Sequence, residues 1–327
     1  MASAEHDLIA RYFRPLASDA GALGLIDDAA VLAASGDDLV VTVDAVVEGV
    51  HFLAADPPDT LARKALRVNL SDLAAKGAVP AGFVLTLALR QAADDWLAPF
   101  ARALGEDAAA FHCPLLGGDT VSTPGPLTIS ITAFGRVPPG RMVRRDGAQE
   151  GDRVVVSGSI GDAALGLDVL KGGKAAAALA GDAAARDFLT GRYRVPQPRL
   201  ALAKTLRDHA DAAMDVSDGL VGDLAKLCAA SGVSARIEAG AVPLSPVAAR
   251  LLASGAVAFE TLVSGGDDYE VLASVAENRW AAFEAAAREV GVAVTTIGRI
   301  TAGAEPPVLV DSRGQAMALQ RLSYSHF

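Results

Sequence analysis

Apolar and polar positions along the chain follow two alternating patterns, which predicts a protein of mixed helices and strands. Short runs of apolar and β-branched residues are typical of buried strands. These runs cover residues 39–43 (LVVTV), 83–89 (FVLTLAL), 127–134 (LTISITAF), 153–158 (RVVVSG) and 269–275 (YEVLASV). Between them, leucine and alanine recur at the spacing of an amphipathic helix. This spacing holds in residues 59–78, 94–111 and 219–232, and Gly232 is suited to end the last helix.

A segment rich in proline, glycine and charge interrupts these patterns at residues 135–153. We predict a domain boundary there, because such composition is typical of a linker. The predicted domains are an N-terminal domain of residues 1–138 and a C-terminal domain of residues 148–327. Residues 171–189 are rich in alanine and predict a peripheral helical segment without a chemical role.

The composition permits a large core and disfavours two classes of partner. Hydrophobic residues make up 51% of the chain and charged residues 21%, which argues against global disorder. The formal net charge is −10, whereas a surface that binds nucleic acid or an anionic membrane is expected to be basic. A small phosphate ligand held by metal ions remains compatible with this charge.

The sequence also predicts the compartment. It contains no run of about 18 apolar residues, so we expect no membrane span. Residues 1–13 carry Glu5 and Asp7 and lack the apolar core of a secretory signal. Cys113 and Cys228 lie far apart and form no CxxC pair, which argues against a disulfide framework or a thiolate metal site. We therefore expect buried cysteines and a cytoplasmic protein.

Aspartate recurs where an apolar run ends or where glycine makes a turn. The aspartates at such places are Asp27, Asp28, Asp44, Asp72, Asp119, Asp215, Asp218, Asp267 and Asp268. Any one of them is readily interpreted as a helix cap or a turn residue. The sequence has no G-x-x-x-x-G-K-[ST] loop, no HExxH and no GxSxG, so the familiar phosphate-binding and catalytic motifs are absent.

As a set, these aspartates predict a site for magnesium and a nucleotide. The carboxyl ends of strands in α/β proteins tend to converge on one crevice. Converging carboxylates repel one another, and cations relieve that repulsion. Mg²⁺ prefers oxygen ligands and shares the phosphates of a substrate. Phosphoryl transfer suits such a site, because it depends on positioning and on charge neutralisation.

The stretch 213–227 (AMDVSDGLVGDLAKL) concentrates this pattern at a predicted strand-to-helix turn. Asp215, Ser217 and Asp218 are either helix-capping residues or ligands, and the two roles are compatible, since a helix N-terminus is also suited to phosphate. Asp223 is interpreted as a solvated helix position.

Three arginines at the predicted domain junction allow two interpretations. Arg141, Arg144 and Arg145 provide a guanidinium fork for a phosphate, or they belong to a solvated basic loop.

Several segments in a fixed order carry a resemblance to a known family. They are LIARYF (8–13), DDAAVL (27–32), VTVDAVVEGVHF (41–52), KALRVNLSDLAAKGAVP (64–80), LLGGDT (115–120), MDVSDGL (214–220), SGGDDYEVL (264–272) and YSHF (324–327). The ordered set resembles the thiamine-monophosphate kinase family, which belongs to the superfamily of aminoimidazole-ribonucleotide synthetase and selenophosphate synthetase. EGVHF, NLSDLAAKG and DVSDGL favour the kinase over its relatives.

The resemblance implies a fold and a reaction. The fold is a two-domain α/β fold of the aminoimidazole-ribonucleotide synthetase type, with an N-terminal sheet domain that forms a homodimer and a C-terminal α/β domain. The reaction is the direct, Mg²⁺-assisted transfer of the γ-phosphoryl group of ATP to thiamine monophosphate, which gives thiamine diphosphate. The nucleotide and several Mg²⁺ ions are expected between the domains. The acceptor is a phosphate ionised at neutral pH, so neither a covalent nucleophile nor a general base is expected.

The resemblance also implies roles for individual residues. The implied metal ligands are Asp28, Thr42, Asp44, Asp72, Asp119, Asp215 and Asp218. The implied ATP contacts are Gly118, Asp119, Arg145 and Ser217. The implied thiamine-phosphate contacts are His51, Asp267 and Tyr324, whose aromatic face suits the cationic thiazolium.

The chain departs from the family pattern at four places. Ile26 precedes the first aspartate pair, where the family usually has glycine, and Val43 replaces a frequent hydroxyl residue. Asp267 stands where the family usually has glutamate and is one methylene shorter. The chain lacks the tryptophan that is common near the terminal HF, which makes Tyr324 the candidate aromatic contact.

Two alternatives remain open from the sequence. One is another enzyme of the superfamily, although residues 1–60 contain no reactive cysteine and EGVHF is not expected in aminoimidazole-ribonucleotide synthetase. The other is a non-catalytic module that binds Mg-nucleotide, against which the nearly complete set of acidic ligands argues.

Overall fold

The computed structural model describes residues 7–25 and 29–323. The chain divides into two compact units. The N-terminal unit comprises residues 1–73 and 78–140, and the C-terminal unit comprises residues 74–77 and 141–327. The short segment 74–77 thus belongs to the C-terminal unit although it lies within the N-terminal half of the sequence.

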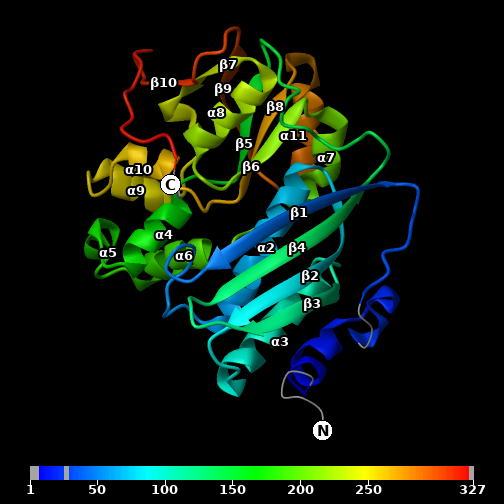
Figure 1. The fold of residues 1–327 in the computed structure, drawn as a ribbon. Coiled ribbons are helices and arrows are strands. Elements are labelled where there is room, and N and C mark those ends of the chain that lie inside the picture. Colours follow the sequence, from blue (N-terminus) through cyan, green and yellow to red (C-terminus); the bar gives the residue numbers. More distant parts are fainter. Residues whose placement is uncertain (1–6, 26–28, 324–327) are drawn as a thin grey trace. The chain divides into compact units, whose positions relative to one another are not determined.

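The N-terminal unit is built on a four-stranded sheet (Figure 1). Its elements are η1 (Ile9–Phe13), η2 (Arg14–Leu16), η3 (Ala20–Leu25), β1 (Asp38–Val47), α2 (Pro58–Ala75), β2 (Val79–Leu89), α3 (Asp94–Ala110), β3 (Leu115–Ser122) and β4 (Thr128–Val137). The strand order is β1-β4-β2-β3, so β1 and β3 form the two edges. Only β2 and β3 pair in parallel, and the other neighbours are antiparallel.

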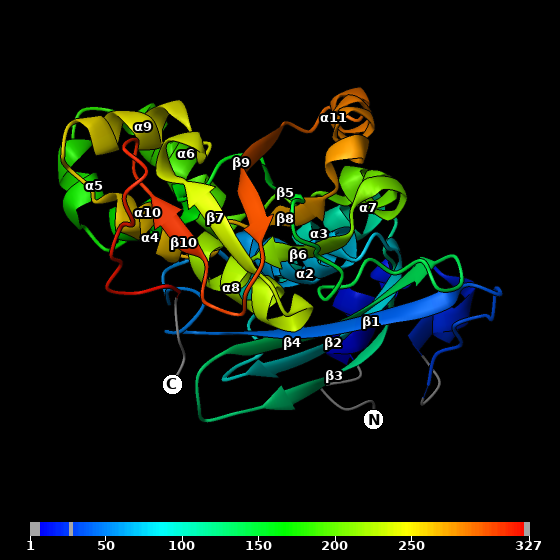
Figure 2. The same ribbon diagram turned by 90° about the horizontal axis from the view of Figure 1, so that it is seen from above.

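The two faces of this sheet differ in polarity and in cover. Helices α2 and α3 lie on one face of the sheet (Figure 2). Strand β1 directs the buried Val40 and Val46 toward this face. On the other face, Leu39, Val41 and Val43 are 46%, 55% and 61% exposed. Strand alternation therefore produces one face packed on helices and one open face on which β1 exposes apolar side chains.

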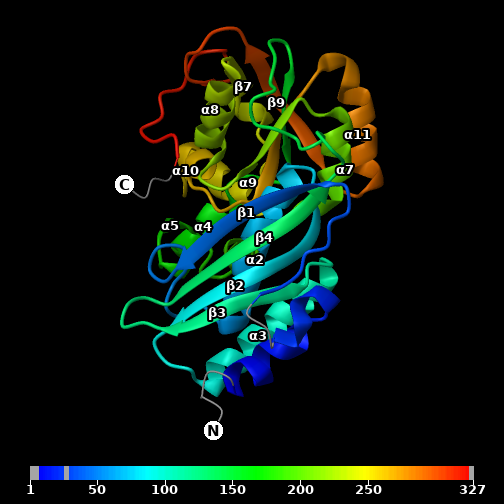
Figure 3. The same ribbon diagram turned by 45° about the vertical axis from the view of Figure 1, so that its right-hand side comes forward.

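The N-terminal turns η1 to η3 lie beside α3 and the edge strand β3 (Figure 3). Phe13 is buried, and Tyr12 donates a hydrogen bond to Asp94 at the start of α3. Arg11 pairs with the same carboxylate. These contacts hold the N-terminal segment against the β3 edge.

The C-terminal unit is built on a six-stranded sheet with the order β10-β7-β9-β5-β8-β6. Its elements are β5 (Arg153–Ser157), α4 (Asp162–Leu170), α5 (Lys174–Ala178), α6 (Ala183–Arg194), η4 (Leu200–Leu202), α7 (Ala203–His209), β6 (Ala212–Val216), α8 (Leu220–Ser231), β7 (Ser234–Glu238), η5 (Ala239–Ala241), α9 (Pro246–Ala253), α10 (Phe259–Ser264), β8 (Glu270–Val275), η6 (Glu277–Arg279), α11 (Trp280–Glu289), β9 (Val294–Thr301) and β10 (Val308–Val310). Helix α8 packs on one face of the sheet, and α7 and α11 pack on the other.

The predicted secondary structure is confirmed where periodicity was strong. The five apolar runs fall in β1, β2, β4, β5 and β8, and the three helical patterns fall in α2, α3 and α8. Gly232 ends α8 with a φ of 67°. The alanine-rich segment forms α5 and the start of α6, separated by a turn. No helix in residues 7–25 and 29–323 is long and apolar enough to span a membrane.

Both cysteines are buried, as expected. Burial raises the pKa of the Cys113 thiol to about 12 and that of Cys228 to about 11. Neither thiol is therefore suited to act as a nucleophile or a metal ligand at neutral pH.

A buried ion cluster anchors the start of β8. Glu270 is fully buried, and its carboxylate accepts hydrogen bonds from Arg192 at 2.8 Å and from Ser157 at 2.6 Å. Arg199 binds both oxygens of the same carboxylate in a bidentate manner. Since an unpaired buried carboxylate is very costly, these partners fix Glu270 and the chain that precedes it.

We expect Arg199→Met to lower the free energy of unfolding by about 3 kcal/mol, because it removes one partner of a buried ion pair. Arg250→Met is the matched control, since Arg250 pairs with Asp182 at the surface and such pairs contribute less than about 1 kcal/mol. Urea unfolding followed by circular dichroism measures both. Equal losses in the two variants would contradict the anchoring role.

Candidate functional site

Strand β1 and helix α2 bring three of the predicted ligands into one neighbourhood. Alternation along β1 directs Thr42 and Asp44 toward α2. Thr42 Oγ1 donates to Asp72 Oδ2 at 2.5 Å. The main-chain N–H of Asp44 donates to Asn69 Oδ1 at 3.1 Å. Asn69 lies one helical turn before Asp72, so both side chains lie on the same face of α2.

Asp119 lies on the opposite face of the sheet and at the opposite edge. It pairs in register with Thr86, Thr86 with Ser130, and Ser130 with Ala45. Directly paired residues share a face, so Asp119 lies on the face of Ala45, away from Asp44. Three strand spacings separate β3 from β1, which corresponds to about 14 Å. Within one chain, Asp119 and Asp44 are therefore too far apart to hold one ion.

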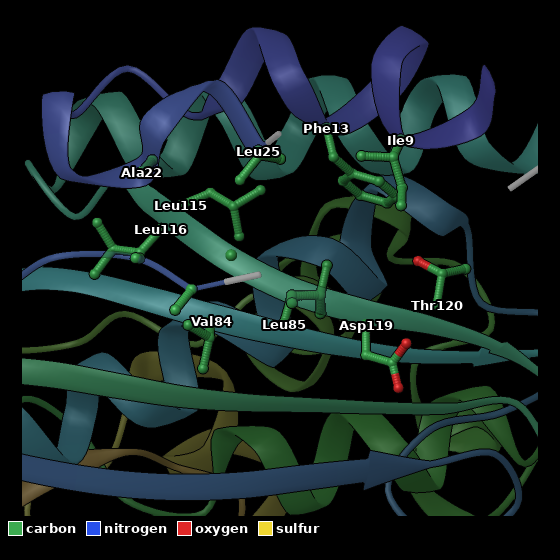
Figure 4. A pocket seen from close by; sticks show the side chains of 14 residues that line it. Ile9, Phe13, Ala22, Leu25, Val84, Leu85, Leu115, Leu116, Asp119 and Thr120 are labelled. Atoms are coloured by element: carbon green, nitrogen blue, oxygen red, sulfur yellow. The ribbon is translucent and has the colours of Figure 1, made fainter. Parts of the chain in front are cut away.

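An apolar pocket of about 270 Å³ lies between the N-terminal turns and strands β2 and β3 (Figure 4). Ile9 and Phe13 line it from η1, and Leu115 and Leu116 line it from β3. Asp119 and Thr120 stand at one end of the pocket, where a carboxylate and a hydroxyl join a largely apolar wall (Figure 4). An apolar slot that ends in a charged group suits a flat, partly charged ligand.

Gly118 also lines this pocket, and the strand pairing explains its lack of a side chain. A Cβ at Gly118 would lie 2.0 Å from the carbonyl oxygen of Leu85 on β2. Any larger residue would push β3 away from β2, so glycine is needed here for sheet packing whether or not a ligand binds.

His51 lies in the turn after β1. Its Nδ1 accepts a hydrogen bond from the main-chain N–H of Val47 at 3.1 Å. Its carbonyl oxygen accepts from the buried Lys64 at 3.0 Å. The neutral imidazole consequently carries its proton on Nε2.

In the C-terminal unit, Asp215, Ser217 and Asp218 lie where β6 gives way to α8. Asp215 is 6% exposed, and Asp218 accepts a hydrogen bond from Lys226 at 2.5 Å. The interpretation of Asp223 as a solvated position is wrong, because Asp223 is fully buried. Its Oδ2 accepts the main-chain N–H groups of residues 217, 218 and 219 at 3.0, 3.0 and 3.1 Å.

The loop before β8 packs directly against this turn. The N–H of Asp267 donates to Ser217 O at 2.7 Å, and that of Tyr269 donates to Val216 O at 2.8 Å. The approach is close enough that a Cβ at Gly266 would lie 2.6 Å from Ser217 O. The structure thus joins Ser217 and Asp267, predicted separately for nucleotide and substrate, through a main-chain hydrogen bond.

The same loop holds two residues in the left-handed region. Asp267 has a φ of 64° and Tyr269 a φ of 51°, conformations that cost energy for residues other than glycine. Between them, the buried Asp268 accepts the N–H groups of Gly161 and Ala163 at 2.8 and 3.3 Å at the start of α4. Burial raises the pKa of Asp268 well above its ordinary value. Asp268 therefore has a structural contact, whereas Asp267 is only partly buried.

The three arginines at the unit boundary differ in their contacts. Arg144 forms a bidentate, exposed pair with Asp146, and Arg141 donates to the carbonyl oxygen of Arg207 at 2.9 Å. Arg145 is exposed, and its guanidinium has no hydrogen-bond or ion-pair partner within the described residues. Of the three, Arg145 is the one whose guanidinium is available to an added anion.

Two predicted residues, Asp28 and Tyr324, lie outside the described residues. Among residues 7–25 and 29–323, no three acidic, histidine or cysteine side chains gather closely enough to hold a metal ion. The structure brings together Thr42 with Asp72, and Ser217 with Asp267, but not Asp119 with Asp44.

Sequence reasoning missed several residues of this neighbourhood, and some carried a signal. Asp223 occupies the i+3 position of the apolar pattern formed by Leu220, Leu224 and Leu227, which marks the buried side of the helix. Glu270 opens a wholly buried and largely apolar strand, where an ionised residue is unusual. The pocket beside Asp119 had no such signal, because it arises from segments far apart in the sequence.

Comparison with known proteins identifies the family. Residues 26–137 match the N-terminal domain, and residues 149–311 the C-terminal domain, of AIR synthase related proteins. Thiamine-monophosphate kinase of Caulobacter vibrioides is 45% identical over 98% of this chain and 90% of that protein.

Solved structures agree with this match. The crystal structure of thiamine-monophosphate kinase from Stenotrophomonas maltophilia has a TM-score of 0.83 and 39% identity, covering 97% of this chain and 99% of that one. AaThiL complexed with AMPPCP and TMP has a TM-score of 0.77 and 30% identity, covering 92% and 91%. The predicted two-domain α/β fold is confirmed, and the chain belongs to the thiamine-monophosphate kinase family within the AIR synthase related proteins.

Proposed function

We propose that this protein transfers the γ-phosphoryl group of ATP to thiamine monophosphate and releases thiamine diphosphate and ADP. The observation that carries the proposal is the match to a thiamine-monophosphate kinase at 45% identity over nearly the whole chain. The AaThiL structure with an ATP analogue and TMP supports the same pair of substrates. The two buried free cysteines fit a reducing cytoplasm, which we propose as its compartment.

ATP is proposed to bind through the pocket beside Asp119. The apolar wall formed by Ile9, Phe13 and Leu116 suits a purine base, and the end near Asp119 suits the polyphosphate through intervening cations. The proposed ATP contacts are Gly118, Asp119, Arg145 and Ser217. The exposed guanidinium of Arg145 would bind phosphate oxygens directly.

Magnesium is proposed to bind the carboxylates that the sequence singled out. The donor set fits, because it consists of carboxylate and hydroxyl oxygens, which are the ligands that Mg²⁺ prefers. The proposed ligands are Asp28, Thr42, Asp44, Asp72, Asp119, Asp215 and Asp218. When bound, Mg²⁺ would neutralise the charge that keeps the two phosphates apart.

Thiamine monophosphate is proposed to contact His51, Asp267 and Tyr324. Asp267 is shorter than the usual glutamate, and the main-chain hydrogen bonds of Asp267 and Tyr269 hold the left-handed backbone that carries its side chain. A carboxylate held in this way can accept hydrogen bonds from an aminopyrimidine. No residue is assigned as a general base, because the acceptor phosphate is already ionised.

Wild-type protein with ATP, MgCl₂ and thiamine monophosphate should form thiamine diphosphate, detected as fluorescent thiochrome diphosphate. Removal of Mg²⁺ with a chelator should abolish the product. Asp119→Asn should lower the rate by about a hundredfold or more, since a lost ligand removes several kcal/mol of charge stabilisation. Asp95→Asn, an exposed carboxylate on α3, is the control and should retain full activity.

The competing function is a sensor that binds Mg-nucleotide without catalysis. It predicts ATP binding without thiamine diphosphate formation. That outcome would reject the kinase proposal, whereas ATP consumption that requires thiamine monophosphate would reject the sensor.

We also propose that two copies of the chain pair through the open face of the N-terminal sheet. Val41, Val43 and Val79 are each more than half exposed on that face, and exposed apolar side chains on an uncovered sheet face are typical of a subunit interface. Asp119 lies on the same face, at the edge farthest from Asp44. Because Asp119 and Asp44 lie too far apart within one chain, we propose that a second copy supplies the Asp119 that completes the site of Asp44 and Asp72.

Val41→Glu should weaken the dimer by about two orders of magnitude, because it buries an unpaired charge in the interface. Val290→Glu, at an equally apolar exposed position elsewhere, is the control. Light scattering coupled to size-exclusion chromatography gives the mass of each variant. A Val41→Glu protein that keeps the wild-type dimer mass would exclude this face as the interface.

A mixture of two inactive variants tests whether the site is shared. Asp44→Asn and Asp119→Asn, unfolded and refolded together in equal amounts, should regain about a quarter of wild-type activity, because half of the dimers are mixed and each restores one site. Refolded wild type and each variant refolded alone are the controls. If both carboxylates served one site from a single chain, the mixture would stay as inactive as its components.

A further inference from the structure

The N-terminus of α8 contains a concave group of main-chain donors that the chain fills with its own carboxylate. The N–H groups of Ser217, Asp218 and Gly219 all point at one oxygen of Asp223, at 3.0 to 3.1 Å. Consecutive N–H groups arranged in this way are typical anion-binding sites. Here the anion is internal, so these donors are not available to a phosphate of the nucleotide.

Lys226 completes the arrangement on the other side of the carboxylate. Its ammonium group lies 2.8 Å from Asp223 Oδ1 and 2.5 Å from Asp218 Oδ2. Asp223 is fully buried, whereas Asp218 and Lys226 are partly exposed. One buried carboxylate thus fixes the backbone of the turn that carries Asp218, while Lys226 bridges the carboxylates of Asp223 and Asp218.

We propose that Asp223 is a positioning residue that aims Asp218 at its metal ion by holding the main chain of residues 217–219. The inference rests on the proposed role of Asp218 as a magnesium ligand. Without Asp223, three N–H groups lose their acceptor, and the turn is free to adopt other conformations. The Asp218 carboxylate would then be ordered only when the metal binds, so the cost of ordering would be subtracted from metal affinity.

The chain provides a matched control for loss of a buried carboxylate. Asp152 is 5% exposed and accepts hydrogen bonds from Gln149 N at 2.9 Å and Ser274 Oγ at 2.6 Å. It precedes β5, which runs in the same direction as β6, because both are antiparallel to β8. Asp152 therefore lies at the opposite end of the strands from Asp218, and its loss tests stability alone.

The experiment compares three variants. Two are the single substitutions Asp223→Ala and Asp152→Ala, and the third carries both Asp223→Asn and Lys226→Met. In the double variant, the asparagine oxygen can still accept the main-chain N–H groups, and its amide faces no ammonium group. Binding of Mn²⁺ without substrates is measured by electron paramagnetic resonance, and the half-saturating Mg²⁺ concentration is measured in the kinase assay. Hydrogen exchange of residues 217–219 reports whether their N–H groups are protected. All measurements are made below the unfolding temperature of each variant.

We expect Asp223→Ala to weaken Mn²⁺ binding and to raise the half-saturating Mg²⁺ concentration by about tenfold or more, as is typical when a group that orients a metal ligand is lost. Exchange at residues 217–219 should become faster. Asp152→Ala should lower stability with unchanged metal binding, and the double variant should return metal binding to near the wild-type value.

Unchanged metal binding in Asp223→Ala, at a stability loss equal to that of Asp152→Ala, would overturn the inference. Wild type that forms no thiamine diphosphate, while Asp223→Ala still weakens Mn²⁺ binding, would reject the proposed reaction and support the positioning role.

Discussion

Buried carboxylates that accept main-chain or guanidinium N–H groups are the interaction on which the loops of the C-terminal unit depend. Asp223 holds the turn after β6, Asp268 holds the start of α4, and Glu270 anchors the first residue of β8. Burial of a carboxylate costs several kcal/mol unless its oxygens accept hydrogen bonds. Each loop therefore adopts the conformation that supplies those hydrogen bonds. The left-handed residues Asp267 and Tyr269 lie between these anchors, which over-determine a backbone that would otherwise relax.

These internal carboxylates also limit which groups of the C-terminal unit are available to bind a phosphate. The donors at the start of α8 are occupied by Asp223, and those at the start of α4 by Asp268. Two helix N-termini that would ordinarily attract phosphate are thus already neutralised by the chain. Under the proposed function, the charge of a polyphosphate would then be neutralised by cations held on carboxylates and by exposed guanidinium groups such as that of Arg145.

The N-terminal unit obeys a different constraint, which is the geometry of its sheet. Strand alternation sends Thr42 and Asp44 toward α2 and sends Val41 and Val43 toward solvent. The strand order then places Asp119 at the far edge on the open face. The same alternation that exposes the valines of β1 therefore also helps to separate Asp44 from Asp119 within one chain.

The sequence by itself determined the strands and helices with strong periodicity, the α/β class and the burial of both cysteines, because these depend on local composition and spacing. It also determined the family, because the family motifs occur along the chain in a fixed order. Only the tertiary structure decided which carboxylates are exposed to a ligand and which are buried and hold the main chain of a loop. Asp218 and Asp223 look alike in the sequence, yet one is partly exposed and the other accepts three main-chain N–H groups. Strand order likewise decided that Asp44 and Asp119 lie apart. The physical reason is that burial and pairing are set by residues distant in sequence, which no local pattern records.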